Sequence, residues 1–508
     1  MIIELPRTTA NPFPTNGVSR DADGVARYDD LPESLVSVLA RHAEATPDAE
    51  AVVEIDGPRL TYRQLYDRAA RVAGGLRGQG VHPGDHVALR YPAGIEWVLG
   101  FWGTIMAGGV PVAVNTRLTP SETDVVLNDA DVAIDLSAGT PLPDGTPFVL
   151  HPRRKDTAAL FYTSGTTAVP KGVPTTHAAF LSNAETLARC VGLPRDIGGA
   201  LRTLISVPLF HVTGCNSQLI AAAYLGGTAV IMPALDLARL TDVLQQERIS
   251  FLVTVPAVYA LLLRRPGLAD ADTTSVRWVG YGGAPIASSL VHQVQRAFPT
   301  AEVFNGYGMT ETASLLTTLP HADAVEHADS VGYAVPVVDL AIDPLDGPNH
   351  GELLARGPNI TAGYWNRQQE TAAATVDGWL RTGDIVRVDA AGRVVIVDRA
   401  KDMINRGGEN VSSVEVEDVL SDAPGVVEVA VVGVPDDVMG EKVGALLVTD
   451  GDEALDVDAV LAHARTRLAD FKLPQYIRVV DGPLPRTAAG KLRKDRLRVE
   501  TEWGAPLR

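Results

Sequence analysis

The stretch at residues 161–173, FYTSGTTAVPKGV, concentrates hydroxyl groups, glycines and one lysine directly after an apolar run. Glycines let backbone N–H groups converge on an anion, and hydroxyls add further donors. A lysine supplies a point charge for phosphate oxygens. The stretch is not a Walker A loop, because Gly165 and Lys171 are six residues apart and Gly172 follows the lysine. A plain turn explains any one of these residues, so only the complete string favours a phosphate-binding loop.

Five further motifs follow in order along the chain. They are GYGGAPI at 280–286, NGYGMTET at 305–312, GWLRTGDIV at 378–386, DRAKDMINRGGENVSSVEVE at 398–417 and PRTAAGKLRK at 485–494. Together with the first stretch, they resemble the motifs of the acyl-adenylate-forming (ANL) superfamily, which includes acyl-CoA synthetases, adenylation domains and beetle luciferases. Within it, the chain resembles the stand-alone acyl-CoA synthetases, or AMP-dependent synthetase-ligases.

The resemblance implies an ATP and AMP site. Asp384 is similar to the carboxylate that accepts both ribose hydroxyls, Tyr307 to the aromatic that stacks on adenine, and Arg399 to a guanidinium near the ribose and phosphates. In isolation, Asp384 is also typical of a turn and Tyr307 of an ordinary core. The implied nucleotide contacts are Thr163, Ser164, Gly165, Thr166, Thr167, Gly283, Ala284, Pro285, Asn305, Gly306, Tyr307, Asp384 and Arg399.

Four residues are implied to be catalytic. Thr310 resembles the hydroxyl bonded to the α-phosphate, and Glu311 resembles the Mg²⁺-holding carboxylate, which fits an ion that takes few protein oxygens. Lys171 lies in the phosphate loop, and Lys491 resembles the lysine that bridges the acyl carboxylate and the α-phosphate. Attack of a carboxylate on phosphorus brings two anions together, so a cation at this point stabilises the developing charge.

The segment VPLFHVTGCNSQL at 207–219 resembles a wall of the acyl site, with His211 at its mouth. No aspartate occurs between 206 and 230 to bind an α-ammonium group, so an α-amino acid is not expected. A medium, cyclic, aromatic or terpenoid monoacid fits this apolar pocket best. The expected lining residues are Phe210, His211, Cys215, Asn216, Tyr281, Gly282, Met309 and Ala313.

The implied reaction has two steps. An acid and MgATP give acyl-AMP and pyrophosphate, and the thiol of coenzyme A then displaces AMP. Lys401 occupies the family's hinge position, and Arg406, Gly407 and Gly408 are expected to line the coenzyme A tunnel. Arg406 stands where relatives have a smaller residue, and Ala168 replaces a usual glycine in the phosphate loop. An alternative therefore stays open: an acyl-AMP ligase whose thioester step occurs elsewhere, on coenzyme A or on a carrier protein acting in trans.

The elements that must position these residues form an α/β pattern. Short β-branched runs such as 228–234 and 249–257 alternate with helix-like segments such as 237–248, which predicts parallel sheets. Residues 219–235 read as a buried helix, a turn and a strand, and 385–398 reads as a hairpin around Ala391 and Gly392. We therefore expect the ANL fold: an adenylation domain at 1–400, with parallel-rich sheets and a β-barrel-like part, and a small mobile α+β domain at 401–508.

The composition limits the remaining function classes. The chain has 508 residues, 46% of them hydrophobic, and a net charge of −18, which argues against nucleic-acid and anionic-membrane binding. Two cysteines exclude a disulfide framework. The start, MIIELPRTTANPFP, is not that of a signal peptide, so we expect a cytoplasmic protein. A homodimer is expected only from the resemblance.

Overall fold

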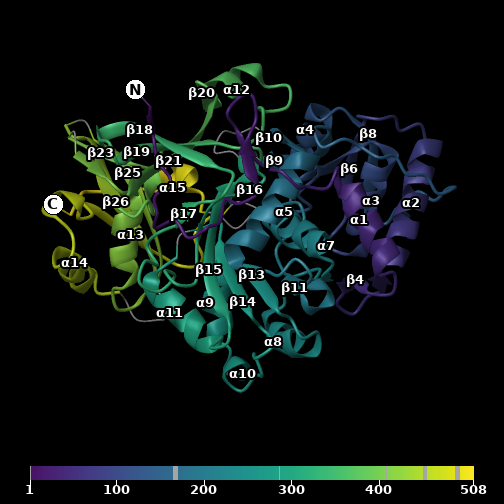
Figure 1. Cartoon of the computed structure of the whole chain (residues 1–508). Helices are drawn as coiled ribbons and strands as arrows, with labels where there is room; N and C mark the ends of the chain where they lie inside the picture. Colours follow the sequence, from purple (N-terminus) through teal and green to yellow (C-terminus); the bar gives the residue numbers. More distant parts are fainter. Residues whose placement is uncertain are drawn as a thin grey trace.

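The structure is a computed structural model that describes residues 2–163, 170–284, 286–407, 409–436, 438–449, 455–486 and 492–507. A nine-stranded sheet forms its centre (Figure 1). Its strand order is β17-β16-β15-β14-β13-β11-β12-β4-β5, and the pairs from β15 through to β4 are parallel. The strands are β4 (Glu50–Glu54), β5 (Arg59–Thr61), β11 (Arg202–Ile205), β12 (Thr228–Ile231), β13 (Phe251–Thr254), β14 (Trp278–Gly282), β15 (Glu302–Met309), β16 (Ser314–Leu319) and β17 (Tyr333–Ala334).

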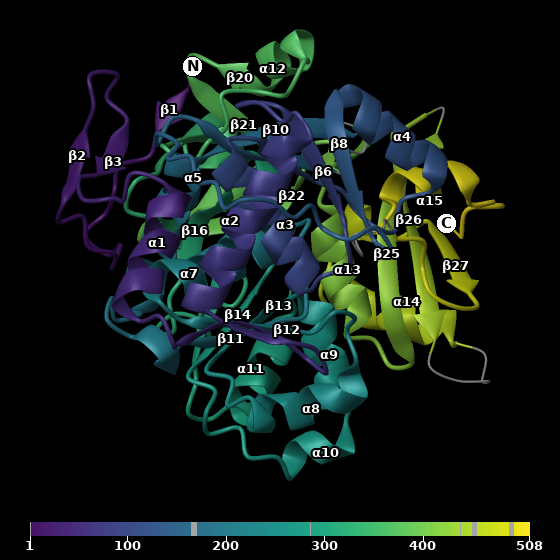
Figure 2. The same ribbon diagram turned by 90° about the vertical axis from the view of Figure 1, so that its right-hand side faces the viewer.

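Helices cover both faces of this sheet, as near-continuous apolar strands require. One face packs on helices α8 (Leu237–Gln246), α9 (Pro256–Leu263) and α11 (Ser288–Ala297), which lie beside the short α10 (Pro266–Ala269) in Figure 2. The other face shares a core with α1 (Leu35–Ala45), α2 (Tyr62–Gly78), α3 (Ile95–Ala107), α5 (His177–Val191) and α7 (Ala221–Leu225).

A second sheet, with strand order β10-β9-β7-β6-β8, shares that second core. Only the β9–β10 pair is antiparallel. Its elements are β6 (His86–Arg90), β7 (Val110–Ala113), β8 (Val132–Ser137), β9 (Thr157–Thr163) and β10 (Lys171–Thr176), with α4 (Pro120–Asp129) on the outside. The strands β9 and β10 flank the phosphate-loop motif.

A third, antiparallel sheet makes the half-barrel part of the fold. It contains β1 (Ile3–Glu4), β18 (Asp339–Gly347), β19 (His350–Arg356), β20 (Thr375–Val376), β21 (Trp379–Val388) and β22 (Val394–Arg399). The remaining elements before Arg399 are the hairpin β2 (Val18–Arg20) and β3 (Ala26–Tyr28), η1 (Gly198–Ala200), α6 (Val212–Gly214), the π-helix η2 (Cys215–Ile220), η3 (Thr310–Thr312) and α12 (Gln368–Ala374).

The last hundred residues form an α+β unit with its own two core clusters, at one side of the molecule in Figure 1. Its sheet order is β24-β23-β26-β25, with β27 beside β26. The elements are β23 (Ile404–Arg406), β24 (Glu409–Val411), α13 (Ser413–Ser421), β25 (Val426–Asp436), β26 (Gly440–Thr449), α14 (Val457–Arg465), η4 (Asp470–Lys472), β27 (Tyr476–Val480) and α15 (Lys494–Glu500).

The expected α/β class, with parallel-rich sheets, a barrel-like part and a C-terminal α+β unit, is confirmed. The segment 219–235 is η2, α7 and β12, with the helix ending at Gly226 in the left-handed region at φ 72°. The strands β21 and β22 form the expected hairpin. Within the described residues, every helix is too short or too polar to cross a membrane.

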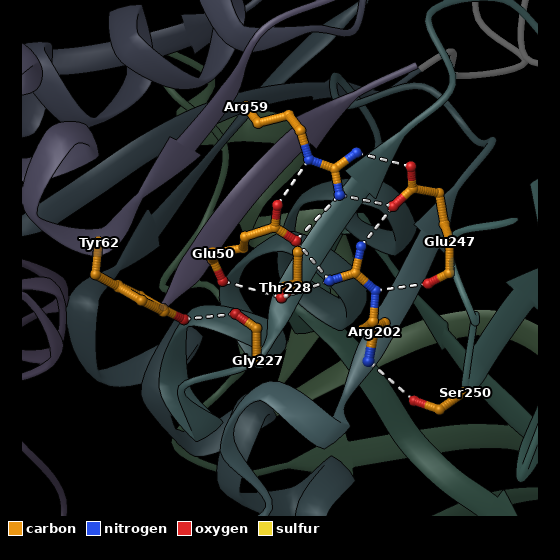
Figure 3. Close-up of polar contacts among 8 residues, drawn as sticks. All are labelled: Glu50, Arg59, Tyr62, Arg202, Gly227, Thr228, Glu247 and Ser250. Atoms are coloured by element: carbon orange, nitrogen blue, oxygen red, sulfur yellow. Dashed lines mark hydrogen bonds and ion pairs between the residues drawn. The ribbon is translucent and has the colours of Figure 1, made fainter. Parts of the chain in front are cut away.

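A charged cluster links Glu50 at the start of β4 and Arg202 at the start of β11 to Arg59 of the edge strand β5 and to Glu247, which follows α8 (Figure 3). Glu50 and Glu247 each accept hydrogen bonds from both Arg59 and Arg202. The Arg202 backbone N–H donates to the Ser250 hydroxyl, 2.9 Å away. Each guanidinium thus has two carboxylate partners, and the cluster fixes the spacing of β4, β5 and β11.

This cluster makes a pH-dependent contribution to stability. Hydrogen bonds from Arg59, more than those from Arg202, lower the pKa of Glu50 from 4.5 to about 2. A lowered pKa in the folded protein means that the stabilisation is present above pH 4.5 and is lost as the pH falls towards 2. We expect Glu50→Gln to lower the free energy of unfolding by about 1 kcal/mol at pH 7, since the group is partly exposed.

The measurement is urea unfolding of both proteins from pH 7 down to pH 3. The difference between them should shrink steadily below pH 4.5, because the wild-type carboxylate becomes protonated. Glu326→Gln, at an exposed position, is the control and should show no such trend. A difference that stays constant with pH would contradict this account.

Candidate active site

Several described residues of the predicted nucleotide site lie where the central sheet meets the other two sheets. Strand β14 ends at Gly282, and β15 runs out through Asn305 and Tyr307 to Met309. In open α/β sheets, ligands bind outside the carboxyl ends of the strands, which is where these residues lie. Gly283 follows β14 with φ 75°, and a Cβ at this position would meet a single atom within 4 Å, so the backbone is open to a ligand there.

Asp384 is the most buried carboxylate of the predicted nucleotide site, with 2% of its surface exposed. It lies on β21, and the hydroxyl of Tyr307 on β15 donates to its Oδ2 over 2.5 Å. The Arg399 Nε lies 2.6 Å from its Oδ1, across the β21–β22 pair. Burial, and secondarily the charge of Asp384, raises the pKa of Tyr307 well above its usual value, so this hydroxyl remains a donor.

Glu311 and Lys171 meet through a residue that the motifs did not identify, Tyr364. The Tyr364 hydroxyl donates to Glu311 Oε1 over 2.8 Å, and the Lys171 Nζ lies 4.7 Å from the centre of the same ring. Glu311 is buried on η3, and Lys171 begins β10. Burial, followed by the charge of Glu311, raises the pKa of Tyr364 above its usual value, so this phenol also stays protonated.

The turn that carries Thr310 and Glu311 has a strained backbone. Ala313 has φ 50° and Ser314 has φ 117°, both in the region that favours glycine. Such conformations persist only where the surroundings enforce them, and they cluster at functional sites. The close approach of β15 to this turn requires glycine at 308, because a Cβ there would lie 1.4 Å from the Ser314 carbonyl oxygen.

Three buried asparagines from different elements hold this turn. Asn216 donates to the Ala313 carbonyl over 2.8 Å, and Asn359 donates to the carbonyls of Thr312 and Leu315, each over 2.8 Å. Asn183 on α5 accepts from the Leu315 N–H over 3.1 Å. The Ser217 and Ser314 hydroxyls lie 2.7 Å apart. Asn216 and Ser217 belong to the π-helix η2, a feature that often marks functional sites.

The structure separates the predicted acyl-pocket residues into two groups. Phe210 and Cys215 are buried in the core on the α5 and α7 side of the central sheet, and Asn216 bonds to Ala313 beside them. The rings of Phe210 and His211 have centroids 4.8 Å apart. Tyr281 instead lies in the core on the opposite face, with Tyr259. The cause is the strand period of two: next to Gly282, residue 281 must face the other way.

Several predicted residues lie outside the described ranges: Ser164, Gly165, Thr166, Thr167, Pro285, Gly408 and Lys491. Thr163 ends β9 opposite Lys171. Lys401 is exposed in a turn in which the N–H groups of residues 402 and 403 bond to the Arg399 carbonyl. Arg406 ends β23, and the Gly407 N–H donates to the Met439 carbonyl over 2.7 Å.

The motifs missed four residues that shape this site: Tyr364, Asn359, Asn183 and Ser217. Tyr364 had one local signal, the pairing of two aromatics in the polar loop sequence TAGYWNR. The others had none, because an isolated Asn or Ser is equally typical of a cap or a turn. Their roles follow from contacts with residues far away in the chain.

Comparison with known proteins agrees with this arrangement. Residues 39–141 and 140–365 match the AMP-binding enzyme family, and residues 415–491 match the AMP-binding enzyme C-terminal domain. The chain belongs to the AMP-binding enzyme family. The predicted membership of the ANL superfamily is thus confirmed.

Similar proteins match over nearly the full length. A feruloyl-CoA synthase of Amycolatopsis is 34% identical over 495 residues, covering 92% of this chain and 99% of the relative. A long-chain-fatty-acid–CoA ligase of Mycobacterium tuberculosis is 33% identical with the same coverage. The solved o-succinylbenzoate CoA synthetase of Bacillus subtilis, in complex with its acyl-adenylate intermediate, is 28% identical with a TM-score of 0.83, covering 92% of this chain and 98% of that one.

Asp384 provides a direct test of the nucleotide site. We expect Asp384→Asn to weaken AMP binding about 10-fold to 100-fold, because hydrogen bonds to a charged group are worth about 1.5–3 kcal/mol. Isothermal titration calorimetry with AMP measures this loss. Asp377→Asn, at an exposed position whose left-handed backbone tolerates asparagine, serves as the matched control. Unchanged AMP affinity in Asp384→Asn would remove this residue from the nucleotide site.

A substitution at Asn359 tests whether its amide stabilises the strained turn. We expect Asn359→Ala to lower the free energy of unfolding by about 2–3 kcal/mol, because two buried carbonyls lose their donor. Urea unfolding measures the change, and the exposed Asn128→Ala is the control. A loss below about 0.5 kcal/mol, the usual range for surface changes, would show that the turn holds its conformation without this amide.

Proposed function

We propose that this chain is an AMP-forming acyl-CoA ligase. In the proposed reaction, ATP activates a carboxylic acid as acyl-AMP, and coenzyme A then takes the acyl group. The observation that carries the proposal lies at the carboxyl end of β15 and in the η3 turn after it: Tyr307 donates to Asp384, and Glu311 accepts from Tyr364, whose ring lies beside the Lys171 Nζ. Asp384 of β21, proposed for the ribose, and Lys171 of β10, proposed for the phosphates, are thus linked to the same end of β15, through Tyr307 and Tyr364, in a chain whose relatives are CoA ligases.

For the first step, Asp384 would hold the ribose hydroxyls, with Asn305 and Gly283 along the adenine edge. Thr310 and Lys171 would bind phosphate oxygens, the lysine as a point charge. Glu311 fits Mg²⁺ because it supplies a buried carboxylate oxygen of the hard type that this ion prefers. The ion, when bound, would neutralise phosphate charge. Among the described residues, no group of three His, Cys, Asp or Glu side chains is placed to hold a metal ion, so ATP oxygens and water would complete the shell of the ion at Glu311.

Lys491 would supply the remaining cation during adenylation, placed between the acyl carboxylate and the α-phosphate. The C-terminal unit would then turn about Lys401 and bring Arg406, Gly407 and Gly408 to the coenzyme A thiol. This proposal includes the domain boundary at residues 400 and 401. We also propose a cytoplasmic enzyme that acts as a homodimer.

The substrate we propose is an apolar medium, cyclic, aromatic or terpenoid monoacid. Phe210 and Cys215 are apolar and buried, and His211 lies beside Phe210. Three relatives that match by sequence are named for feruloyl, long-chain-fatty-acid and indoleacetate substrates, all monoacids with a large apolar part. Pyrophosphate release over a panel containing ferulate, indoleacetate, decanoate and a terpenoid acid tests this class. Release with malonate or an α-amino acid alone would contradict it.

One observation favours a second candidate, an acyl-AMP ligase that leaves thioester formation to another protein. The Arg406 Nε is buried and has no hydrogen-bond partner among the described residues. A guanidinium at this point either contacts a coenzyme A phosphate or blocks the thiol's path. Mass spectrometry after incubation with the best acid, ATP and coenzyme A separates the two candidates. Acyl-CoA supports the ligase, whereas accumulated acyl-AMP supports the second candidate with a carrier in trans.

A substitution at Lys491 should affect adenylation and acyl transfer to coenzyme A differently. We expect Lys491→Ala to slow pyrophosphate release about 10²–10³-fold, the usual effect of removing one group that stabilises transition-state charge. Transfer from synthetic acyl-AMP to coenzyme A should be nearly unaffected, because that step has no second anion to neutralise. Lys155→Ala, at an exposed position, is the control. Full pyrophosphate release by Lys491→Ala would refute the role of this lysine.

A further inference from the structure

Tyr364 contacts two residues of the proposed phosphate site, Glu311 and Lys171. Its hydroxyl donates to Glu311 Oε1 over 2.8 Å, and its ring face lies 4.7 Å from the Lys171 Nζ. A lysine over an aromatic face is attracted by the negative charge of the ring face. One side chain therefore orients a carboxylate with its edge and an ammonium with its face.

The backbone around Tyr364 is fixed to the same two elements. The Trp365 N–H donates to the Gly172 carbonyl over 2.8 Å, directly beside Lys171. The Thr361 N–H donates to the Glu311 carbonyl over 2.8 Å, and its hydroxyl donates to the Pro174 carbonyl over 3.1 Å. The segment 361–365, which contains Tyr364, thus bridges β10 and η3.

The Tyr364 backbone is fixed from the other side as well. Its N–H donates over 2.9 Å to the hydroxyl of Thr371, a residue of α12. The ring is half-buried, so solvent does not compete freely for its hydroxyl. Its position is set by the protein before any ligand binds.

We infer that Tyr364 is a positioning residue that holds Glu311 ready for the metal and Lys171 ready for the phosphates of ATP. This inference rests on the proposed function. The hydroxyl orients the carboxylate so that its other oxygen points away from Tyr364, as a partner in the outer shell of a metal site does. The ring keeps the lysine extended beside β10 without neutralising it, since an aromatic face carries no net charge.

Two substitutions separate these effects. Tyr364→Phe removes the hydroxyl and keeps the ring, whereas Tyr364→Leu removes both. Tyr162→Phe is the matched control, because its hydroxyl also donates to a carboxylate, Asp129, over 2.8 Å on the neighbouring strand β9. Calorimetric titration with ATP at a series of Mg²⁺ concentrations, and with AMP, provides readouts that need no acid substrate.

We expect Tyr364→Phe to require about 10-fold more Mg²⁺ for the same ATP affinity, the lower end of what outer-shell changes cost metal sites. Its ATP affinity without metal should match wild type, because Lys171 keeps its ring. Tyr364→Leu should also lose about three-fold in metal-free ATP affinity. AMP affinity should be unchanged in both, because Asp384 and Tyr307 do not contact Tyr364.

Two results overturn the inference in distinguishable ways. If wild type binds ATP and Tyr364→Phe shows the wild-type Mg²⁺ dependence, Tyr364 does not position Glu311, and the proposed function is untouched. If wild type binds no ATP at any Mg²⁺ concentration, the proposed function fails and this inference fails with it. Should Tyr364→Leu fold poorly, Tyr364→Phe alone decides, because it preserves the packing of the ring.

Discussion

The strained turn from Thr310 to Ser314 is the constraint on which the site depends. Two consecutive residues with positive φ cost about 1–3 kcal/mol each, so other contacts must enforce them. Asn183, Asn216 and Asn359 do so from three separate elements. A relaxed backbone would continue β15 towards β16 as an ordinary hairpin and turn Glu311 away from Tyr364. The buried amides therefore stabilise the turn in the conformation that directs the Glu311 carboxylate towards Tyr364.

The same strand explains why three sheets are needed. Strand β15 belongs to the nine-stranded sheet, yet side chains of this strand and of the η3 turn after it contact residues attached to the other two sheets. Tyr307 donates to Asp384 of the third, antiparallel sheet, and Glu311 accepts from Tyr364, whose loop is attached to β10 of the second sheet. Each sheet alone presents one group of the proposed site, so the chemistry we propose can exist only after all three have packed together.

The sequence predicted the class of fold, the hairpin of β21 and β22 and the order of the site motifs, because these depend on local period and spacing. It placed Asp384 with Tyr307 through the resemblance, and the 2.5 Å contact agrees with that neighbourhood. It grouped Tyr281 with the acyl pocket, although strand alternation sends that ring to the opposite core. The roles of Tyr364 and Asn359 could not be predicted locally, since their partners lie about 50 residues away in sequence, and only the paired aromatics of TAGYWNR drew attention to Tyr364.

The region around Lys401 shows which free-energy contributions would oppose and favour the proposed movement of the C-terminal unit. Asp398 precedes this residue and accepts hydrogen bonds from the backbone and side chain of Ser413, which follows it. Any large turn about Lys401 must break these bonds. Burial raises the pKa of Asp398 despite the nearby charge of Lys494, so its carboxylate is poorly solvated in this arrangement. Release into water would recover that solvation and offset the lost hydrogen bonds, which would bring the two proposed positions of the unit closer in free energy.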